Sequence, residues 1–264
     1  MQRPLERILP YAVFGGLLVL WQIGSDTGRL NPLLFPAPSK VVIALALGVV
    51  APAKTGYALP VHVAHSLSLL TLGFIVGGVL GLCGGIAAGL SSLVYRSLSP
   101  ILGFIAPIPA IAWTPVAMVW IGTGNPTILA IVALACFSEV IFNTITGVRS
   151  VPRLYLWQAR SLGADRRFLF WHVLLPAALP SVLVGIRLGL AASWRALIGA
   201  EMFGGVAWGL GFVLYDAKQF YATDAMFAAL LLVIAFSLAL EQGVLRRVEY
   251  FTIERWGLAR TLKA

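Results

Sequence analysis

Residues 148–176 read VRSVPRLYLWQARSLGADRRFLFWHVLLP and form a basic, amphipathic stretch between two long apolar runs. Pro152 is typical of the first turn of a helix, because its ring fixes φ and its missing N–H would have no partner there. Gly163 can adopt the left-handed conformation that ends a helix, and Asp165 can cap the helix that follows. We therefore expect two short helices with a joint at Gly163. A short basic helix suits either an anionic lipid surface or the groove of a partner protein, and the pattern leaves both open.

The chain around this stretch is too apolar for a water-soluble globular protein. Of its 264 residues, 59% are apolar and 11% are charged, and the mean hydropathy is +0.92, whereas soluble domains are about 45–50% apolar and about 25% charged. Runs long enough for a helix of about 20 residues lie at about 8–25, 66–93, 100–122, 127–147, 174–200 and 222–245. The sequence predicts an all-α polytopic membrane protein with about six transmembrane helices. The shorter stretch 38–50 predicts a surface helix capped by Ser39.

The basic residues predict the orientation of the spans. Six spans place both termini on one side, together with thirteen of the nineteen Lys and Arg residues, against four on the other side. Cytoplasmic loops carry the excess of Lys and Arg, so we expect Met1, Ala264 and the loop 149–172 in the cytoplasm. The net charge of +9 then reflects membrane orientation and contact with membrane lipid, and no nucleic-acid partner is expected.

Small residues and prolines predict how two of the spans pack. The second run carries a glycine at every fourth position: Gly73, Gly77, Gly81, Gly85 and Gly89. Such a stripe lets helix backbones approach closely in a membrane, so a neighbouring helix should cross here tightly.

The third run contains four prolines: Pro100, Pro107, Pro109 and Pro115. They should bend or break the helix, and a broken helix at membrane depth must line a cavity or be buried in protein. Residues 107–115 are thus a candidate pathway wall, although the prolines could also only shape packing.

Motifs of membrane enzymes and metal sites are missing from the sequence. It contains no Gly-x-Ser-x-Gly, no His-Glu-x-x-His and no Gly-Lys pair of a phosphate-binding loop. His62 and His65 precede a span without a nearby carboxylate, which favours interface histidines over metal ligands. Cys83 and Cys136 lie in apolar runs and are expected to be small buried hydrophobes. We expect no catalytic residue, no metal and no cofactor on this chain, so any ATP must be bound by another chain.

Charges inside the apolar runs are candidates for the translocation pathway, because burying them is costly. At about 1.5 Å per helical residue, Arg187 falls near mid-membrane and Arg195 near the outer end of the fifth run. Glu139 reaches a depth at which it could pair with Arg187. Arg195, with Trp194 beside it, could receive an anion or could extend to the outer interface. Trp113, in the proline-rich segment, completes the candidate set.

The basic stretch resembles the cytoplasmic loop of permease subunits of bacterial ATP-binding-cassette (ABC) importers. That loop reads Glu-Ala-Ala, three residues, Gly, nine residues, then an aliphatic residue, any residue, Leu-Pro. Five positions of this chain match the pattern: Ala159, Gly163, Val173, Leu175 and Pro176. Trp157 and Gln158 depart from it, since the family often has Glu and Ala there. The similarity runs over most of residues 35–245 and is to the nitrate, sulfonate, taurine and bicarbonate branch.

The resemblance implies a single permease domain, 1–264, with a core at about 60–245 and a cytoplasmic coupling segment at about 149–172. Its partners would be a second permease subunit, expected to be a copy of this chain, two ATPase subunits that bind ATP and Mg²⁺, and an extracytoplasmic substrate-binding protein. The location would be the bacterial cytoplasmic (inner) membrane. The solute would be a small anion such as nitrate, sulfonate, taurine or bicarbonate.

Within the coupling segment, the resemblance assigns transmission of ATPase closure to seven residues: Ala159, Arg160, Ser161, Leu162, Gly163, Ala164 and Asp165. The alternative function is a self-sufficient channel or secondary transporter whose loop only binds anionic lipid. A membrane-embedded enzyme ranks third, because its motifs are missing.

Overall fold

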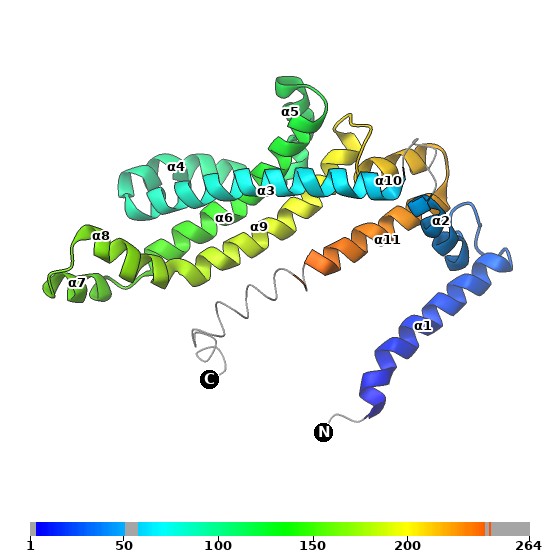
Figure 1. The fold of residues 1–264 in the computed structure, drawn as a ribbon, viewed down its shortest axis with the longest axis horizontal. Helices are drawn as coiled ribbons and strands as arrows, with labels where there is room; N and C mark the ends of the chain where they lie inside the picture. The colour runs from blue at the N-terminus through cyan, green and yellow to red at the C-terminus, as the bar shows by residue number, and fades with distance from the viewer. Residues whose placement is uncertain (1–3, 51–57, 241–242, 244–264) are drawn as a thin grey trace. The chain divides into compact units, whose positions relative to one another are not determined.

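The computed structural model describes residues 4–50, 58–240 and 243, and every regular element in these ranges is helical. The chain divides into two compact units. The first contains Met1–Ala64 and Ala207–Ile234, and the second contains His65–Val206 and Ala235–Ala264. Figure 1 shows the helices of both units.

The first unit contains α1 (Pro4–Asp26), α2 (Pro38–Val50), α10 (Leu210–Gln219) and most of α11 (Thr223–Ala239), together with the start of α3 (Leu59–Leu90). Leu59, Val213 and Ala229 form its buried core. Ser39 lies inside α2, and its N–H donates to Gln22 Oε1 of α1 at 3.1 Å. The prediction that Ser39 caps this helix is therefore wrong, because α2 already begins at Pro38 and a side chain of α1 accepts the N–H of Ser39.

The second unit contains the rest of α3, then α4 (Ser92–Ile105), η1 (Ala110–Trp113), α5 (Thr114–Ile121), α6 (Asn125–Ser150), α7 (Arg153–Ser161), α8 (Arg166–Phe168), the π-helical turn η2 (Leu169–Leu174) and α9 (Leu175–Phe203). Helices α6 and α9 run side by side, and α7 and α8 lie at one end of that pair (Figure 1). The core of the second unit is apolar and includes Ile128, Ile131, Val140 and Leu197, which are all at most 1% exposed.

Three described helical runs are long and apolar enough to cross a membrane: Leu59–Leu90, Asn125–Ser150 and Arg166–Phe203. A fourth candidate is the pair of α4 and η1–α5, which is bent by 87°. Helix α1 lies where the first span is expected, and α11 lies where the last is expected but has 17 described residues. The expected all-α membrane fold is confirmed, and the count of six spans stays a prediction.

The third expected span is broken, as its prolines predict, but its boundaries differ from the prediction. Helix α4 begins at Ser92 because Ser91 Oγ accepts the N–H of Val94 at 3.4 Å and thereby caps a new helix. The break falls between α4 and η1, at residues 106–109. Pro100 lies within α4, whereas Pro115 lies in the first turn of α5, where a missing N–H has no consequence.

The glycine stripe of α3 is crossed tightly by α6, which confirms the predicted close approach. A Cβ at Gly77 would overlap the carbonyl oxygen of Ala133, and one at Gly73 would lie 2.6 Å from Val132 Cγ1. The stripe ends at Gly89, where a Cβ would lie 2.5 Å from Val148 Cγ1. The partner is a helix of the same chain, so the stripe is used inside the subunit.

Candidate functional site

The basic stretch 148–176 folds as two short helices with a tight joint, as predicted. Gly163 has a φ of 87°, in the left-handed region. The N–H groups of Gly163 and Ala164 donate to the carbonyls of Arg160 and Ala159, at 2.9 and 3.0 Å. This pair of bonds is a Schellman cap, which closes the end of a helix and turns the chain sharply. The direction of the chain after α7 therefore depends on the backbone of Gly163.

Asp165 and Pro176 shape the return into the membrane helix. Asp165 Oδ1 accepts the N–H of Phe168 at 2.8 Å and caps α8, as predicted. The helix then widens through η2, where the N–H of Leu175 donates to Phe170 O. Pro176 has no N–H to donate and its ring displaces the carbonyl four residues earlier, so the wide turn accommodates it. Pro152 directly precedes α7 and does not occupy its first turn, a one-residue difference from the prediction.

Helix α7 has two faces with different surroundings. Arg153, Leu156 and Arg160 share one face, at spacings of three and four residues, and line a cavity. Leu154 and Tyr155 point elsewhere and are 56% and 53% exposed. Leu162, directly after the helix, is 89% exposed. The second face is therefore an exposed apolar surface on a short basic helix.

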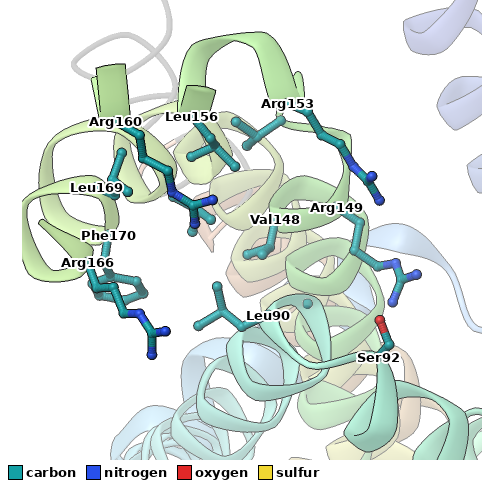
Figure 2. Close-up of a pocket in the computed structure, with 13 residues that line it drawn as sticks. Leu90, Ser92, Val148, Arg149, Arg153, Leu156, Arg160, Arg166, Leu169 and Phe170 are labelled. Carbon is teal, nitrogen blue, oxygen red and sulfur yellow. The ribbon is translucent and has the colours of Figure 1, made fainter. Parts of the chain in front are cut away.

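We name the cavity behind α7 the basic cavity, a space of about 640 Å³ between α7 and the ends of α3, α6 and α8. Figure 2 shows Arg149 and Arg153 on one side of it, and Arg160 and Arg166 on the other. The Arg149 guanidinium lies 4.0 Å from the centre of the Tyr95 ring, a cation–π contact that holds it in place. Four apolar residues form the floor: Leu90, Val148, Phe170 and Leu174.

Glu139 and Arg195 both line a second cavity, of about 310 Å³. Glu139 belongs to α6 and Arg195 to α9, and the break between α4 and η1 supplies Pro109 and Ala110. A carboxylate, a guanidinium and a helix break thus surround one space. Part of the proline-rich segment lines a cavity, in agreement with the expectation for 107–115.

The other pathway candidates, Arg187, Trp194 and Trp113, are not among the residues that line this second cavity. Arg187, Trp194 and Arg195 line a third cavity, of about 240 Å³. Trp194 is buried, with its ring 6.3 Å from that of Phe236. Trp113 lies in η1, and its ring contacts Phe104 edge-on with centroids 6.4 Å apart. The expected pairing of Glu139 with Arg187 stays a prediction, because the cavities place Glu139 with Arg195 and Arg187 with Trp194.

A buried polar contact between α3 and α9 was not predicted from the sequence. Glu201 is 1% exposed, and Ser66 Oγ lies 2.7 Å from its Oε1 and 3.0 Å from its Oε2. The hydroxyl therefore donates to a carboxylate inside the second unit. A Glu next to a long apolar run was the available signal, since a buried carboxylate needs donors. The sequence alone does not identify Ser66 as one of them.

The cysteine prediction was partly wrong, and the structure adds a buried hydrogen bond to one of the two histidines. His62 is fully buried in the first unit, and its Nδ1 accepts the N–H of Gly209 at 3.2 Å. It is a buried residue of that unit, and its position at the membrane interface stays a prediction. Cys136 is buried as expected, but Cys83 is exposed, because it lies on the face of α3 away from the glycine stripe.

Comparison with known proteins gives consistent matches over most of the chain. Residues 77–244 match the family described as binding-protein-dependent transport system inner membrane component. The taurine transport system permease protein TauC of Escherichia coli is 34% identical over 92% of this chain and 90% of its own length. The nitrate import permease protein NrtB of Synechocystis is 30% identical over 90% of this chain and 86% of its own.

Two further similarities concern a third transporter and the fold. The bicarbonate transport system permease protein CmpB of Synechococcus elongatus is 30% identical over 84% of this chain and 82% of its own length. An inward-facing structure of the MetNI methionine ABC transporter aligns with a TM-score of 0.59 and 21% identity. That alignment covers 69% of this chain and 90% of the solved one, and supports the fold.

Proposed function

The chain belongs to the family of inner membrane components of binding-protein-dependent transport systems, and from that premise we propose how it works as the permease of an ABC importer. Two copies of it form the translocation pathway, two ATPase subunits bind ATP and Mg²⁺, and an extracytoplasmic binding protein delivers the solute. The chain itself carries out no catalytic step and holds no cofactor. Relatives at 30–34% identity support this, since each is named as a permease of an uptake or transport system.

The observation that carries the proposal is the capped joint after α7. Residues 159–165 connect a helix with an exposed apolar face to the helical run that enters the membrane. Coupling requires a contact that differs between two states, and burial of exposed apolar side chains on a partner supplies such a contact. Closure of the ATPase subunits moves α7, and the capped turn at Gly163 transmits this movement to the helical run Arg166–Phe203.

The proposed orientation places both termini and residues 149–172 in the cytoplasm, where the ATPase subunits bind. The test is single-cysteine labelling of Ser161→Cys in intact cells with a membrane-impermeant maleimide, after replacement of Cys83 and Cys136 by Ser. We expect no labelling until the cells are opened. A second experiment tests whether the cysteine of the Ser161→Cys variant forms a disulfide crosslink with the ATPase that copurifies. Labelling in intact cells, or purification of an active transporter without an ATPase chain, would contradict the proposal and favour a self-sufficient carrier.

The transported solute is a small oxyanion, and Arg195 is its main contact in the pathway. The names of the relatives mention taurine, nitrate and bicarbonate, which share a charged group of several oxygen atoms. A guanidinium binds such a group through two parallel hydrogen bonds. Glu139 lines the same cavity as Arg195 and orients it, while Arg187 and Trp194 line the adjoining cavity. Trp113 belongs to η1, whose residues Ala110 and Ile111 line the cavity of Glu139.

Substitution of Arg195 separates anion binding from a merely interfacial role. We expect both Arg195→Lys and Arg195→Gln to lower uptake at least about tenfold, because a charged bidentate contact is worth about 1.5–3 kcal/mol. The measurement is ATP-driven uptake of radiolabelled taurine and nitrate by the assembled complex. Lys218→Gln removes an exposed cation that lines none of these cavities and serves as the control. Normal uptake by Arg195→Lys would instead assign Arg195 to the membrane interface.

A further inference from the structure

Among the residues that the structure describes, the basic cavity carries more positive charge than the acidic side chains of the segments around it neutralise. Segments 89–99 and 146–176 contain six arginines and one acidic residue, Asp165. Asp165 Oδ1 already accepts the N–H of Phe168. Four of the arginines line the cavity itself: Arg149, Arg153, Arg160 and Arg166. Like charges gathered in one space repel one another, so the arrangement is stabilised by an anion between them.

The geometry of the cavity suits a phosphate group. Guanidinium groups bind phosphate through paired N–H donors and are less strongly hydrated than ammonium groups. The arginines stand on both sides of the space in Figure 2, with Val148 and Leu90 between them. The cation–π contact with Tyr95 fixes Arg149 before any ligand arrives. A volume of about 640 Å³ exceeds the size of a phosphate alone and leaves room for the group that carries it.

The position of the cavity favours a lipid over a soluble anion. It lies at the last turn of α3 and the last turn of α6, where two membrane-crossing helices end. Its floor is apolar, through Leu90, Val148 and Leu174. The exposed face of α7 that we assign to the ATPase is a different face of the helix, so the partner would not fill this cavity. Basic pockets between helix ends on the cytoplasmic side are a recognised type of anionic headgroup site.

We propose that the basic cavity binds the phosphate of an anionic phospholipid of the cytoplasmic leaflet. This rests on the proposed orientation. The headgroup connects Arg153 and Arg160 of α7 to Arg149 of α6 and Arg166 of α8, and so holds the coupling helix against the ends of the membrane helices. Movement of α7 is then transmitted only when the site is filled, and coupling depends on the lipid composition of the membrane.

The test compares two double variants that lose the same charge. Arg153→Gln with Arg166→Gln removes two lining arginines, whereas Arg96→Gln with Arg167→Gln removes two nearby arginines that do not line the cavity. The purified complex with its ATPase is placed in nanodiscs of phosphatidylcholine containing roughly one third phosphatidylglycerol. Native mass spectrometry then counts the phosphatidylglycerol that stays bound.

Wild type and the Arg96/Arg167 variant should retain phosphatidylglycerol, and the Arg153/Arg166 variant should retain it about tenfold more weakly. Equal retention by all three would overturn the proposal. So would a complex in pure phosphatidylcholine whose ATP-driven uptake is restored by millimolar inorganic phosphate, because the ligand would then be a soluble anion. If the double variant does not assemble, Arg153→Gln alone answers the same question, with Arg167→Gln as its control.

Lipid retention is measured without transport, so the two proposals fail separately. A complex that copurifies with its ATPase and imports solute equally well with or without phosphatidylglycerol would overturn the role of the lipid in coupling and leave the importer function intact. A chain that retains phosphatidylglycerol but copurifies with no ATPase would contradict the importer function and leave the lipid site standing.

Discussion

The crossing of α3 and α6 and the joint after α7 both depend on glycine, for opposite physical reasons. At the crossing, glycines have ordinary helical backbones, and what matters is space, because a Cβ at Gly77 would overlap the backbone of Ala133. At the joint, a Cβ at Gly163 would meet nothing within 4 Å, and what matters is its φ of 87°. The first region is held rigid by close packing, and the second holds a direction by backbone conformation. Substitutions should therefore destabilise the fold in one region and disturb coupling in the other.

The largest effect is expected for Gly77→Ala. Because the added methyl group overlaps the carbonyl of Ala133, α3 and α6 must move apart along their whole contact. Overpacking of this kind costs about 3 kcal/mol at the upper end of the usual range. That loss corresponds to a fall of about 6–12 °C in the unfolding temperature for a chain of this size. The measurement is thermal unfolding of the purified subunit in detergent, followed by size-exclusion chromatography.

The neighbouring glycine provides a matched control for this substitution. A Cβ at Gly78 would meet only Cys136 Sγ, at 3.7 Å, which is an ordinary contact distance. Gly78→Ala should therefore be neutral or slightly stabilising, since Ala favours the helix by about 1 kcal/mol over Gly. Equal unfolding temperatures for the two variants would show that the crossing is not limited by space.

A smaller effect in the same rigid region is expected for Ser66→Ala. It removes one donor from the buried carboxylate of Glu201, and hydrogen bonds to charged groups contribute about 1.5–3 kcal/mol. Ser68→Ala, two residues away, removes an exposed hydroxyl that donates only to His65 O at 2.7 Å. Unfolding in increasing denaturant should separate the two variants by about 2 kcal/mol. A Ser66→Ala subunit as stable as Ser68→Ala would mean that the other contacts of Glu201 suffice.

The sequence predicted the features that follow from local chemistry. The glycine stripe, the left-handed Gly163 and the cap at Asp165 each depend on one residue type at one spacing, and all three are confirmed. The break in the third span was also predicted, but its position was not. The sequence does not show which of the four prolines is tolerated inside a helix, as Pro100 is in α4, and which lies at the break, because the packing of neighbouring helices decides this.

The cavities and the buried polar contact could not be predicted, because they depend on tertiary packing. Glu139 and Arg195 are 56 residues apart in sequence, and helix depth gave no reason to place them at one cavity. The pairing of Glu139 with Arg187 stays a prediction. Depth gives no information on which face of a helix a side chain occupies relative to its neighbour. The four arginines of the basic cavity were visible in the sequence as loop charges, but only the fold brings Arg149 of α6 and Arg166 of α8 around the same space as α7.

The smallest effect on stability, and the most informative for coupling, is expected for Gly163→Val. A β-branched residue at positive φ costs about 1–2 kcal/mol, and the open space around Gly163 means that no neighbour is displaced. The strain therefore falls on the Schellman cap alone, so α7 frays or points elsewhere while the membrane helices stay folded. We expect normal insertion, a fall of no more than about 2–8 °C in the unfolding temperature, and loss of both solute uptake and its stimulation of ATP hydrolysis.

Two further variants identify backbone conformation as the cause. Asn tolerates the left-handed region better than other residues with a Cβ, so Gly163→Asn should retain much of the uptake. Gly103→Val changes a glycine that also has nothing within 4 Å of its Cβ position but lies in the regular backbone of α4, and it should leave coupling intact. If Gly163→Val transports normally while Gly77→Ala is destabilised, the joint is not the coupling element. Equal losses of uptake in Gly163→Val and Gly163→Asn would instead indicate that coupling fails because a side chain is present at position 163, and not because the residue disfavours a positive φ.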